Sequence, residues 1–224
     1  DVVVGNPPWD EVDVEELAFY ARYRPGLRAM SADPRVEALA RLKEERPELE
    51  KLLERERSER ETLRKYLGPD AGYRKGAGDP DLYKFFCQRY RDLLRDGGRL
   101  GVVLPRSAFV AKGSSDFRDW LFTETAPQRI DFLLNNRNWA FDIHPQYTVA
   151  LLAAVRRAPI PDEPIVAAGV ASSAREFAVQ ITGPGIRIAR TALGPNREVP
   201  LLPSQAHADL LAKLREGIPF PYGT

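Results

Sequence analysis

An amide, two prolines and an indole follow one another near the start of the chain, at Asn6, Pro7, Pro8 and Trp9. The side-chain oxygen of Asn6 can accept one hydrogen bond, and the backbone carbonyl of Pro7 can accept another. Two neighbouring acceptors can hold the two protons of one amine. The face of the Trp9 ring can stack on a flat aromatic ring. These residues therefore suit a ligand that carries an exocyclic amine on an aromatic ring.

An amine of this kind is a poor nucleophile because its lone pair is delocalised into the ring. Acceptors outside the ring plane favour a pyramidal nitrogen and stabilise the positive charge that develops on it, so that activation requires only positioning and electrostatics. The natural electrophile for it is a methyl group on a sulfonium. An adenine in duplex DNA can be alkylated in this way only after it has left the helix.

A short strand must position this turn. Val2, Val3 and Val4 form a β-branched run that ends at Gly5, which predicts a fully buried strand. Each proline fixes φ and lacks an N–H, and a residue before proline is pushed out of the helical region, so the turn is expected to be rigid. Ligands of open α/β sheets bind at the carboxyl ends of strands, where this turn lies.

Strands and helices alternate along the rest of the chain. Strands are predicted at residues 99–105, 129–134 and 147–155, and helices at residues 12–23, 81–96 and 115–124. This alternation indicates an α/β domain with a mainly parallel sheet. The apolar residues expected to face inward from the helix at 81–96 and its end are Leu82, Phe85, Phe86, Tyr90, Leu93 and Leu94.

Two segments differ from this pattern. Residues 34–67 are dense in Arg, Glu and Leu, and Pro47 divides them into two predicted helices, which we interpret as a solvated hairpin inserted at about residues 33–67. Beyond Arg157, short alternating stretches and loops predict small strands and one more helix at residues 205–216. We expect the catalytic half of a domain over residues 1–157 and a C-terminal extension over residues 158–224.

Several stretches resemble a known family. The opening DVVVGNPPW is similar to motif IV of the amino-methyltransferases that modify adenine in DNA, whose usual form is Asn-Pro-Pro followed by Tyr, Phe or Trp. Residues 81–109 resemble the next block of the adenine methylases of restriction-modification and phage defence, and residues 136–157 resemble a later block. Residues 194–211 are similar to the segment that leads towards target recognition.

The resemblance implies a Rossmann-like sheet of an S-adenosylmethionine-dependent methyltransferase, acting as a site-specific, adenine-specific enzyme on double-stranded DNA. By this match, Asn6 and Pro7 hold the target amine, and Trp9 and Phe141 sandwich the flipped base. Trp139 is the weaker candidate for the second aromatic position. A restriction nuclease or another protein of a defence system is the implied partner.

The same resemblance assigns Asn6 and Pro8 to the cofactor side of the site. The family also places a glycine-rich cofactor loop and an acidic residue for the ribose before motif IV, and neither occurs in this sequence. Gly97 and Gly98 lie between a helix and a strand, which is the wrong context for such a loop. Because the chain begins at Asp1, on the threshold of a strand, we expect a fragment of a longer polypeptide. Because it lacks most of the cofactor half, we expect this fragment to be inactive by itself.

Composition limits the other functions. The chain has 224 residues, of which 43% are hydrophobic and 29% are charged, and its formal net charge is +1, values typical of a globular domain. A single cysteine, Cys87, excludes an internal disulfide and suits the reducing cytoplasm. No segment has the length and apolarity of a membrane span. His144 and His207 are far apart and lack Cys or His partners at metal spacing, which makes a zinc site improbable.

Cations in loops at the ends of the sheet are the expected phosphate contacts. Arg106 and Lys112 are the leading candidates, and Arg118, Arg137 and Arg157 fall in or near similar loops. Two other functions stay open. The same turn would serve the methylation of an RNA base or of a protein glutamine, and the chain could also be a catalytically inactive DNA-binding module.

Overall fold

The computed structural model describes residues 1–67, 80–143 and 147–217. The chain forms two compact units, one made of residues 1–9 and 74–224 and the other of residues 10–73. We call the first the sheet unit and the second the helical unit.

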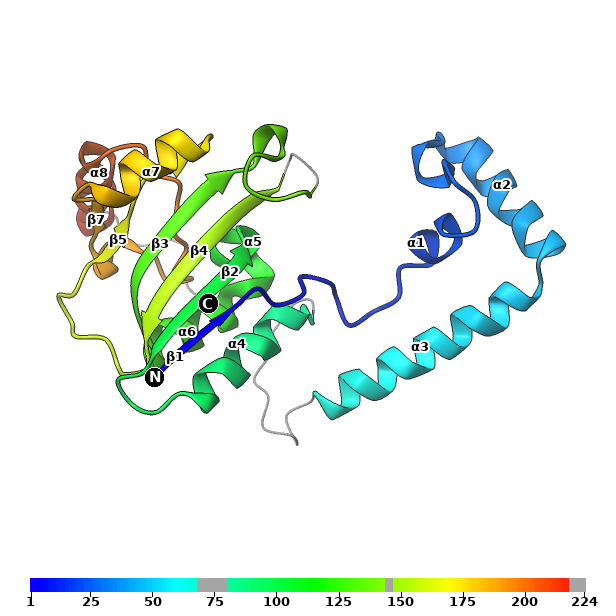
Figure 1. The fold of residues 1–224 in the computed structure, drawn as a ribbon, viewed down its shortest axis with the longest axis horizontal. Helices are drawn as coiled ribbons and strands as arrows, with labels where there is room; N and C mark the ends of the chain where they lie inside the picture. Colours follow the sequence, from blue (N-terminus) through cyan, green and yellow to red (C-terminus); the bar gives the residue numbers. More distant parts are fainter. Residues whose placement is uncertain (68–79, 144–146, 218–224) are drawn as a thin grey trace. The chain divides into compact units, whose positions relative to one another are not determined.

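The sheet unit is built around seven strands (Figure 1). The long strands are β2 (Arg99–Pro105), β3 (Ala126–Leu134) and β4 (Thr148–Val155). The short strands are β1 (Val2–Gly5), β5 (Ile165–Ala167), β6 (Val170–Ala171) and β7 (Ile186–Ile188). Their order is β1-β2-β4-β3-β5-β7, and β6 also pairs with β3. The α/β class predicted from the sequence is confirmed.

The long strands are not all parallel. β1 is parallel to β2, whereas β4 lies between β2 and β3 and is antiparallel to both. The sheet is therefore mixed rather than mainly parallel, and the carboxyl ends of β1, β2 and β3 lie at the same edge. The connection between β3 and β4 accounts for the reversal, because its described part contains no α-helix of the kind that a parallel crossover requires.

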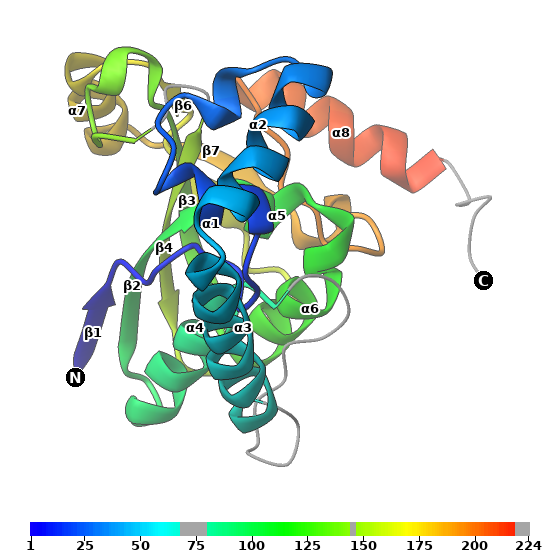
Figure 2. The same cartoon turned by 90° about the vertical axis from the view of Figure 1, so that its right-hand side faces the viewer.

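Three helices cover one face of the sheet (Figure 2). They are α4 (Leu82–Leu93), the short α5 (Ser107–Val110) and α6 (Ser115–Glu124). Alternate residues of the strands meet them: Val102 lies in the large core cluster beneath these helices, whereas Val103 packs with the smaller cluster that contains Leu133 and Val149. The sheet thus separates two apolar layers, and the smaller layer borders the turn at Asn6–Trp9.

The apolar face of α4 differs from the prediction. Phe86 and Leu93, both expected inside, are 38% and 59% exposed, whereas Tyr83 and Cys87 are buried in the core. Lys84 is buried as well, and its ammonium lies 3.0 Å from the carboxylate of Asp81. This ion pair allows a charged residue to occupy an interior position.

The prediction of a fully buried first strand is wrong. Val2 and Val4 are 65% and 78% exposed, and only Val3 packs against the main core cluster. The reason is position: β1 pairs on one side only, with β2, and is the edge strand of the sheet. A run of β-branched residues indicates a strand, but it does not indicate how many neighbours that strand has.

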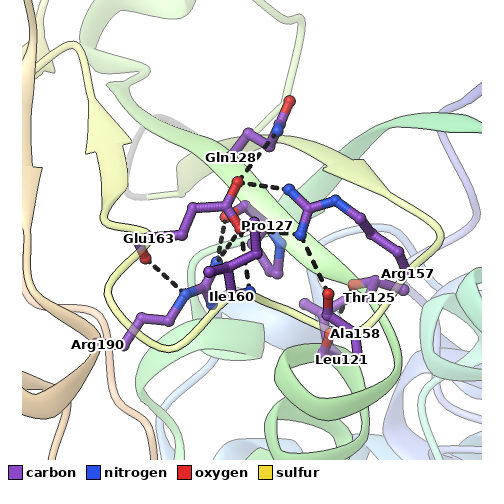
Figure 3. A network of polar contacts seen from close by, with 9 residues as sticks. All are labelled: Leu121, Thr125, Pro127, Gln128, Arg157, Ala158, Ile160, Glu163 and Arg190. Atoms are coloured by element: carbon purple, nitrogen blue, oxygen red, sulfur yellow. Dashed lines mark hydrogen bonds and ion pairs between the residues drawn. The ribbon is translucent and has the colours of Figure 1, made fainter. Parts of the chain in front are cut away.

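Residues after β4 belong to the same compact unit. β5 and β7 extend the sheet, while α7 (Ala174–Thr182) contacts β6 and α8 (Gln205–Gly217) contacts β7. Figure 3 shows how Glu163 joins this region together: its carboxylate lies 2.6 Å from the Arg157 guanidinium, and its carbonyl accepts a 2.7 Å hydrogen bond from Arg190 Nε. Arg190 also donates to the carbonyl of Pro127 in β3, which ties the extension to the sheet.

The helical unit has its own core. Its helices are α1 (Glu16–Ala21), α2 (Ala32–Glu45) and α3 (Glu48–Tyr66). Pro47 separates α2 from α3, as predicted, because proline can begin a helix but cannot continue one. Phe19, Tyr20, Leu42, Leu49 and Leu53 are buried together, whereas Leu52, predicted on the same apolar stripe, is 41% exposed. Among the described residues, no helix is both long and apolar enough to cross a membrane.

Candidate active site

The turn at Asn6–Trp9 starts where β1 ends. Gly5 is the last paired residue of β1, and a Cβ atom at this position would lie 2.6 Å from the hydroxyl oxygen of Tyr90 in α4. Glycine therefore allows the end of the strand to approach the Tyr90 ring closely. In the turn itself Pro7 is buried, whereas Asn6 and Pro8 are exposed. The Asn6 side chain makes no hydrogen bond with the described part of the chain, so its amide is free to meet a ligand.

Trp9 makes one hydrogen bond and one aromatic contact within the sheet unit. Its indole Nε1 donates a 3.4 Å hydrogen bond to the carbonyl of Val103, which lies one residue beyond the last β1–β2 pair. Its ring centroid lies 6.5 Å from that of Tyr147, at an interplanar angle of 53°. The side chain is only partly buried. Trp9 thus has a defined orientation and still presents surface to the space beside it.

A hollow of about 460 Å³ lies next to this turn. Its lining residues are Asn6, Pro7, Pro8, Trp9, Phe141 and Ile143. The turn and Phe141 are far apart in the sequence, and the fold brings them to one place because β1 and β3 end at the same edge of the sheet. The volume is within the usual range for pockets that bind small ligands, and the lining is apolar apart from the amide and the backbone.

Phe141 reaches the hollow from the loop between β3 and β4. The ring is partly buried and packs with Trp9 and Ile143 against the smaller apolar layer. Trp139, the weaker sequence candidate, packs against the same layer but does not line the hollow, and its Nε1 donates a 2.8 Å hydrogen bond to the carbonyl of Leu134. His144 follows in the same loop and lies outside the described residues.

The candidate phosphate contacts have different environments. Arg106 directly follows β2 at the edge that carries the hollow, and Lys112 is exposed in a short 3-10 helix, Lys112–Ser114. Arg137 is exposed, and Arg157 is paired with Glu163.

The interpretation of Arg118 as a loop cation is wrong. Arg118 is completely buried in α6 and donates to the carbonyls of Ala108, Ala111 and Asn196. Burial lowers the pKa of its guanidinium. The sequence contains a signal for this position, because a helical period places residue 118 on the same face as Leu121 and Phe122, both of which are buried.

Other groups with reactive side chains stand apart from the hollow. Cys87 is fully buried in α4, and this burial raises the pKa of its thiol far above the ordinary range. His207 accepts or donates a 2.7 Å hydrogen bond with Ser204 at the start of α8. Within residues 1–67, 80–143 and 147–217, no group of three or more His, Cys, Asp or Glu side chains could hold a metal ion.

A second hollow, of about 410 Å³, has a different lining. Arg91, Arg156 and Arg157 contribute to it, together with Asp96 and Glu124. Each arginine already faces a carboxylate: Arg91 lies 3.0 Å from Glu124, Arg156 lies 3.3 Å from Asp96, and Arg157 pairs with Glu163. Within the described part of the chain, each of the three arginines of this hollow thus has a carboxylate partner.

The first hollow fits a flat ring better than a complete nucleoside cofactor. A ribose is usually held by a carboxylate and by closely approaching backbone, and the ammonium of an amino-acid group also needs an acceptor. None of the six residues that line the hollow is charged. The described lining of the hollow therefore does not supply partners for a complete cofactor of this kind.

Comparison with known families gives one match. Residues 54–139 match the Eco57I restriction-modification methylase family. The matched region includes α4, β2, α6 and β3. It starts after the turn at Asn6–Trp9 and ends two residues before Phe141. No curated protein sequence is similar enough to this chain to count as a relative.

Solved structures from restriction-modification systems align with parts of this chain, and this chain spans well under half the length of each. A protein from Vibrio vulnificus YJ016, described as the modification subunit of a type I restriction enzyme, gives a TM-score of 0.47 at 12% identity, over 91% of this chain and 37% of its own. The DrdV–DNA complex gives a TM-score of 0.44 at 15% identity, over 88% of this chain and 18% of the DrdV chain. The M protein of the type I enzyme EcoKI gives 0.36 at 14% identity, over 47% and 25% of the two chains.

Proposed function

We propose that this chain carries the base-holding part of a DNA methyltransferase that transfers a methyl group to the exocyclic amine of a flipped adenine, in restriction-modification or phage defence. The observation that carries the proposal is the convergence of Asn6, Pro7, Trp9 and Phe141 around one hollow. The match of residues 54–139 to a restriction-modification methylase family supports the same reaction class.

In this proposal the turn activates the amine. The Asn6 side-chain oxygen accepts one amine proton, and the Pro7 carbonyl accepts the other, which favours a pyramidal nitrogen with an available lone pair. Trp9 stacks on one face of the base and Phe141 covers the other. The hydrogen bond from Trp9 to Val103 fixes the ring before the base arrives, so that little ordering is left for the moment of binding.

S-adenosylmethionine is the proposed cofactor and would supply an electrophilic methyl group. Only Asn6 and Pro8 are assigned to its reactive end. Double-stranded DNA is the proposed partner, and Arg106 and Lys112 are the proposed phosphate contacts, because Arg106 directly follows β2 and Lys112 is exposed in the short 3-10 helix after α5. A cytoplasmic location and an association with a restriction nuclease complete the proposal.

The test is to express the complete reading frame that encodes this chain in a bacterium without DNA methylation. The DNA is then sequenced by a method that registers methylated adenine. We expect marks at one sequence word in the wild type and none in Asn6→Ala. Asn136→Ala is the matched control, since it removes an exposed asparagine amide that does not line the hollow.

Other results would redirect the proposal. If both proteins fold and leave the DNA unmethylated, the DNA reaction is wrong, and mass spectrometry of RNA and protein from the same cells tests the related amine and amide substrates. DNA binding that survives Asn6→Ala, without methylation by the wild type, would instead indicate an inactive binding module.

A further inference from the structure

One buried side chain holds the backbone of Phe141. Asn135 is 0% exposed and follows the last residue of β3. Its Nδ2 donates a 2.7 Å hydrogen bond to the carbonyl of Phe141. Its Oδ1 accepts hydrogen bonds of 3.1 Å from the backbone amides of Ala140 and Phe141. Both backbone polar groups of Phe141 are therefore bonded to the same amide.

The loop has a compact shape that depends on these bonds. Arg137 and Asn138 both have positive φ, at 64° and 55°, which is uncommon for residues other than glycine. Two left-handed residues in succession turn the chain back towards the end of β3, where the carbonyl of Asn135 accepts a hydrogen bond from the Asn138 amide. The Asn135 side chain bonds to Ala140 and Phe141 beyond these two residues, and these hydrogen bonds offset the strain of the conformation.

The hydrogen bonds of Asn135 also determine where the Phe141 ring lies relative to the hollow. The φ and ψ angles of a residue determine the direction of its Cα–Cβ bond, and three hydrogen bonds to one rigid amide fix the peptide groups on both sides of the Phe141 Cα atom. The ring is thereby directed to the space that it shares with Asn6 and Trp9. Apolar packing alone would leave the ring more freedom, because its side chain is only partly buried.

We propose that Asn135 is a positioning residue that sets Phe141 against the bound base without touching the substrate. The proposal rests on the proposed function. Both the Oδ1 acceptor and the Nδ2 donor of the Asn135 side chain are needed at this position. Alanine would leave two amides and a carbonyl without this partner, and aspartate would keep the acceptor but place an oxygen against the Phe141 carbonyl.

The first measurement is hydrogen exchange in the full-length protein. In the wild type the amides of Ala140 and Phe141 are expected to be protected, since both donate to Asn135. Asn135→Ala should remove this protection while the strands keep theirs. Asn136→Ala changes the adjacent, exposed asparagine and should leave the exchange unchanged. If Asn135→Ala does not fold, Asn135→Asp replaces it, and the expected result is faster exchange at Ile143, whose amide donates to the Phe141 carbonyl that the aspartate oxygen would repel.

The second measurement is a double-mutant cycle on kcat/KM for methyl transfer. Asn135→Ala is expected to lower kcat/KM about 10- to 100-fold, the usual effect of misplacing a substrate-holding group by about 1 Å. In a Phe141→Ala background the same change should cost less than about 3-fold, because the ring that Asn135 positions is gone. A merely structural defect would lower activity by the same factor in both backgrounds.

Equal fold-changes in kcat/KM in the two backgrounds would overturn the positioning role. So would an Asn135→Ala variant that loses the amide protection at Ala140 and Phe141 and still keeps full activity. If the wild type methylates DNA and Asn135→Ala does so at the same rate, only the role of Asn135 is wrong. If the wild type transfers no methyl group to DNA, RNA or protein, the proposed function has failed, and the substrate-holding role of Asn135 is overturned with it.

Discussion

Replacing Gly5 by alanine tests how closely the end of β1 is packed. The added Cβ would lie 2.6 Å from the Tyr90 hydroxyl oxygen and 2.7 and 2.8 Å from the ring carbons Cζ and Cε2, whereas carbon atoms in contact are normally about 3.5–4.0 Å apart. Because the hydroxyl and two ring carbons are affected together, the Tyr90 side chain must leave its place beside the end of β1. Overpacking of this kind costs about 1–3 kcal/mol, so we expect Gly5→Ala to lower the free energy of unfolding by that amount.

The assay is urea unfolding followed by tryptophan fluorescence. All three tryptophans, at positions 9, 120 and 139, belong to the sheet unit, so the signal reports on that unit alone. Gly101→Ala is the control, because its Cβ would meet Val4 at 3.6 Å, an ordinary contact. In a Tyr90→Ala background the cost of Gly5→Ala should fall to about zero. Equal costs for the two glycines, or a cost that persists without the Tyr90 ring, would refute the reasoning.

Three further predictions follow from charge and burial. Cys87 should not react with a thiol reagent at pH 8 until urea unfolds the chain, because burial raises its pKa; stoichiometric reaction of the folded protein would contradict its placement. Hydrogen bonds from Arg157 lower the pKa of Glu163. The Glu163 carboxylate therefore contributes fully to the free energy of unfolding above the unfolded pKa of about 4.3, and this contribution is lost as pH falls through the lower folded pKa. Glu163→Gln should therefore lower the free energy of unfolding by about 1–3 kcal/mol at pH 7 and by less in acid, and a pH-independent difference would argue against this. Lys112→Gln should reduce the slope of log binding constant against log salt for DNA by about 0.9, while Lys213→Gln should leave it unchanged.

Local features of the site could be predicted from the sequence. The turn at Asn6–Trp9 is determined by two prolines and a glycine, whose backbone limits operate within a few residues. Phe141 could be predicted as a site residue only through the family resemblance. The exposure of Val4 could not be predicted, because it depends on which strands lie beside β1, and a short apolar run looks the same at the centre and at the edge of a sheet.

Nonlocal hydrogen bonds explain the residues that sequence reasoning missed. Asn135 belongs to the stretch NNRN, which is typical of an exposed turn, and its buried role depends on the carbonyl of a residue six positions later. The antiparallel direction of β4, in contrast, had a usable signal. No helical pattern separates the strand that ends at Leu134 from the one that begins at Thr148, and a parallel return would need such a crossover.

The central place of β4 has a consequence for synthesis on the ribosome. β2 and β3 emerge first, yet the backbone groups that face each other across the gap between them find partners only when residues 148–155 arrive. Until then the nascent chain presents two open strand edges, which are templates for aggregation. A chain that terminates before Thr148 would keep both edges permanently and should accumulate in inclusion bodies, even though it would still contain Asn6, Trp9 and Phe141.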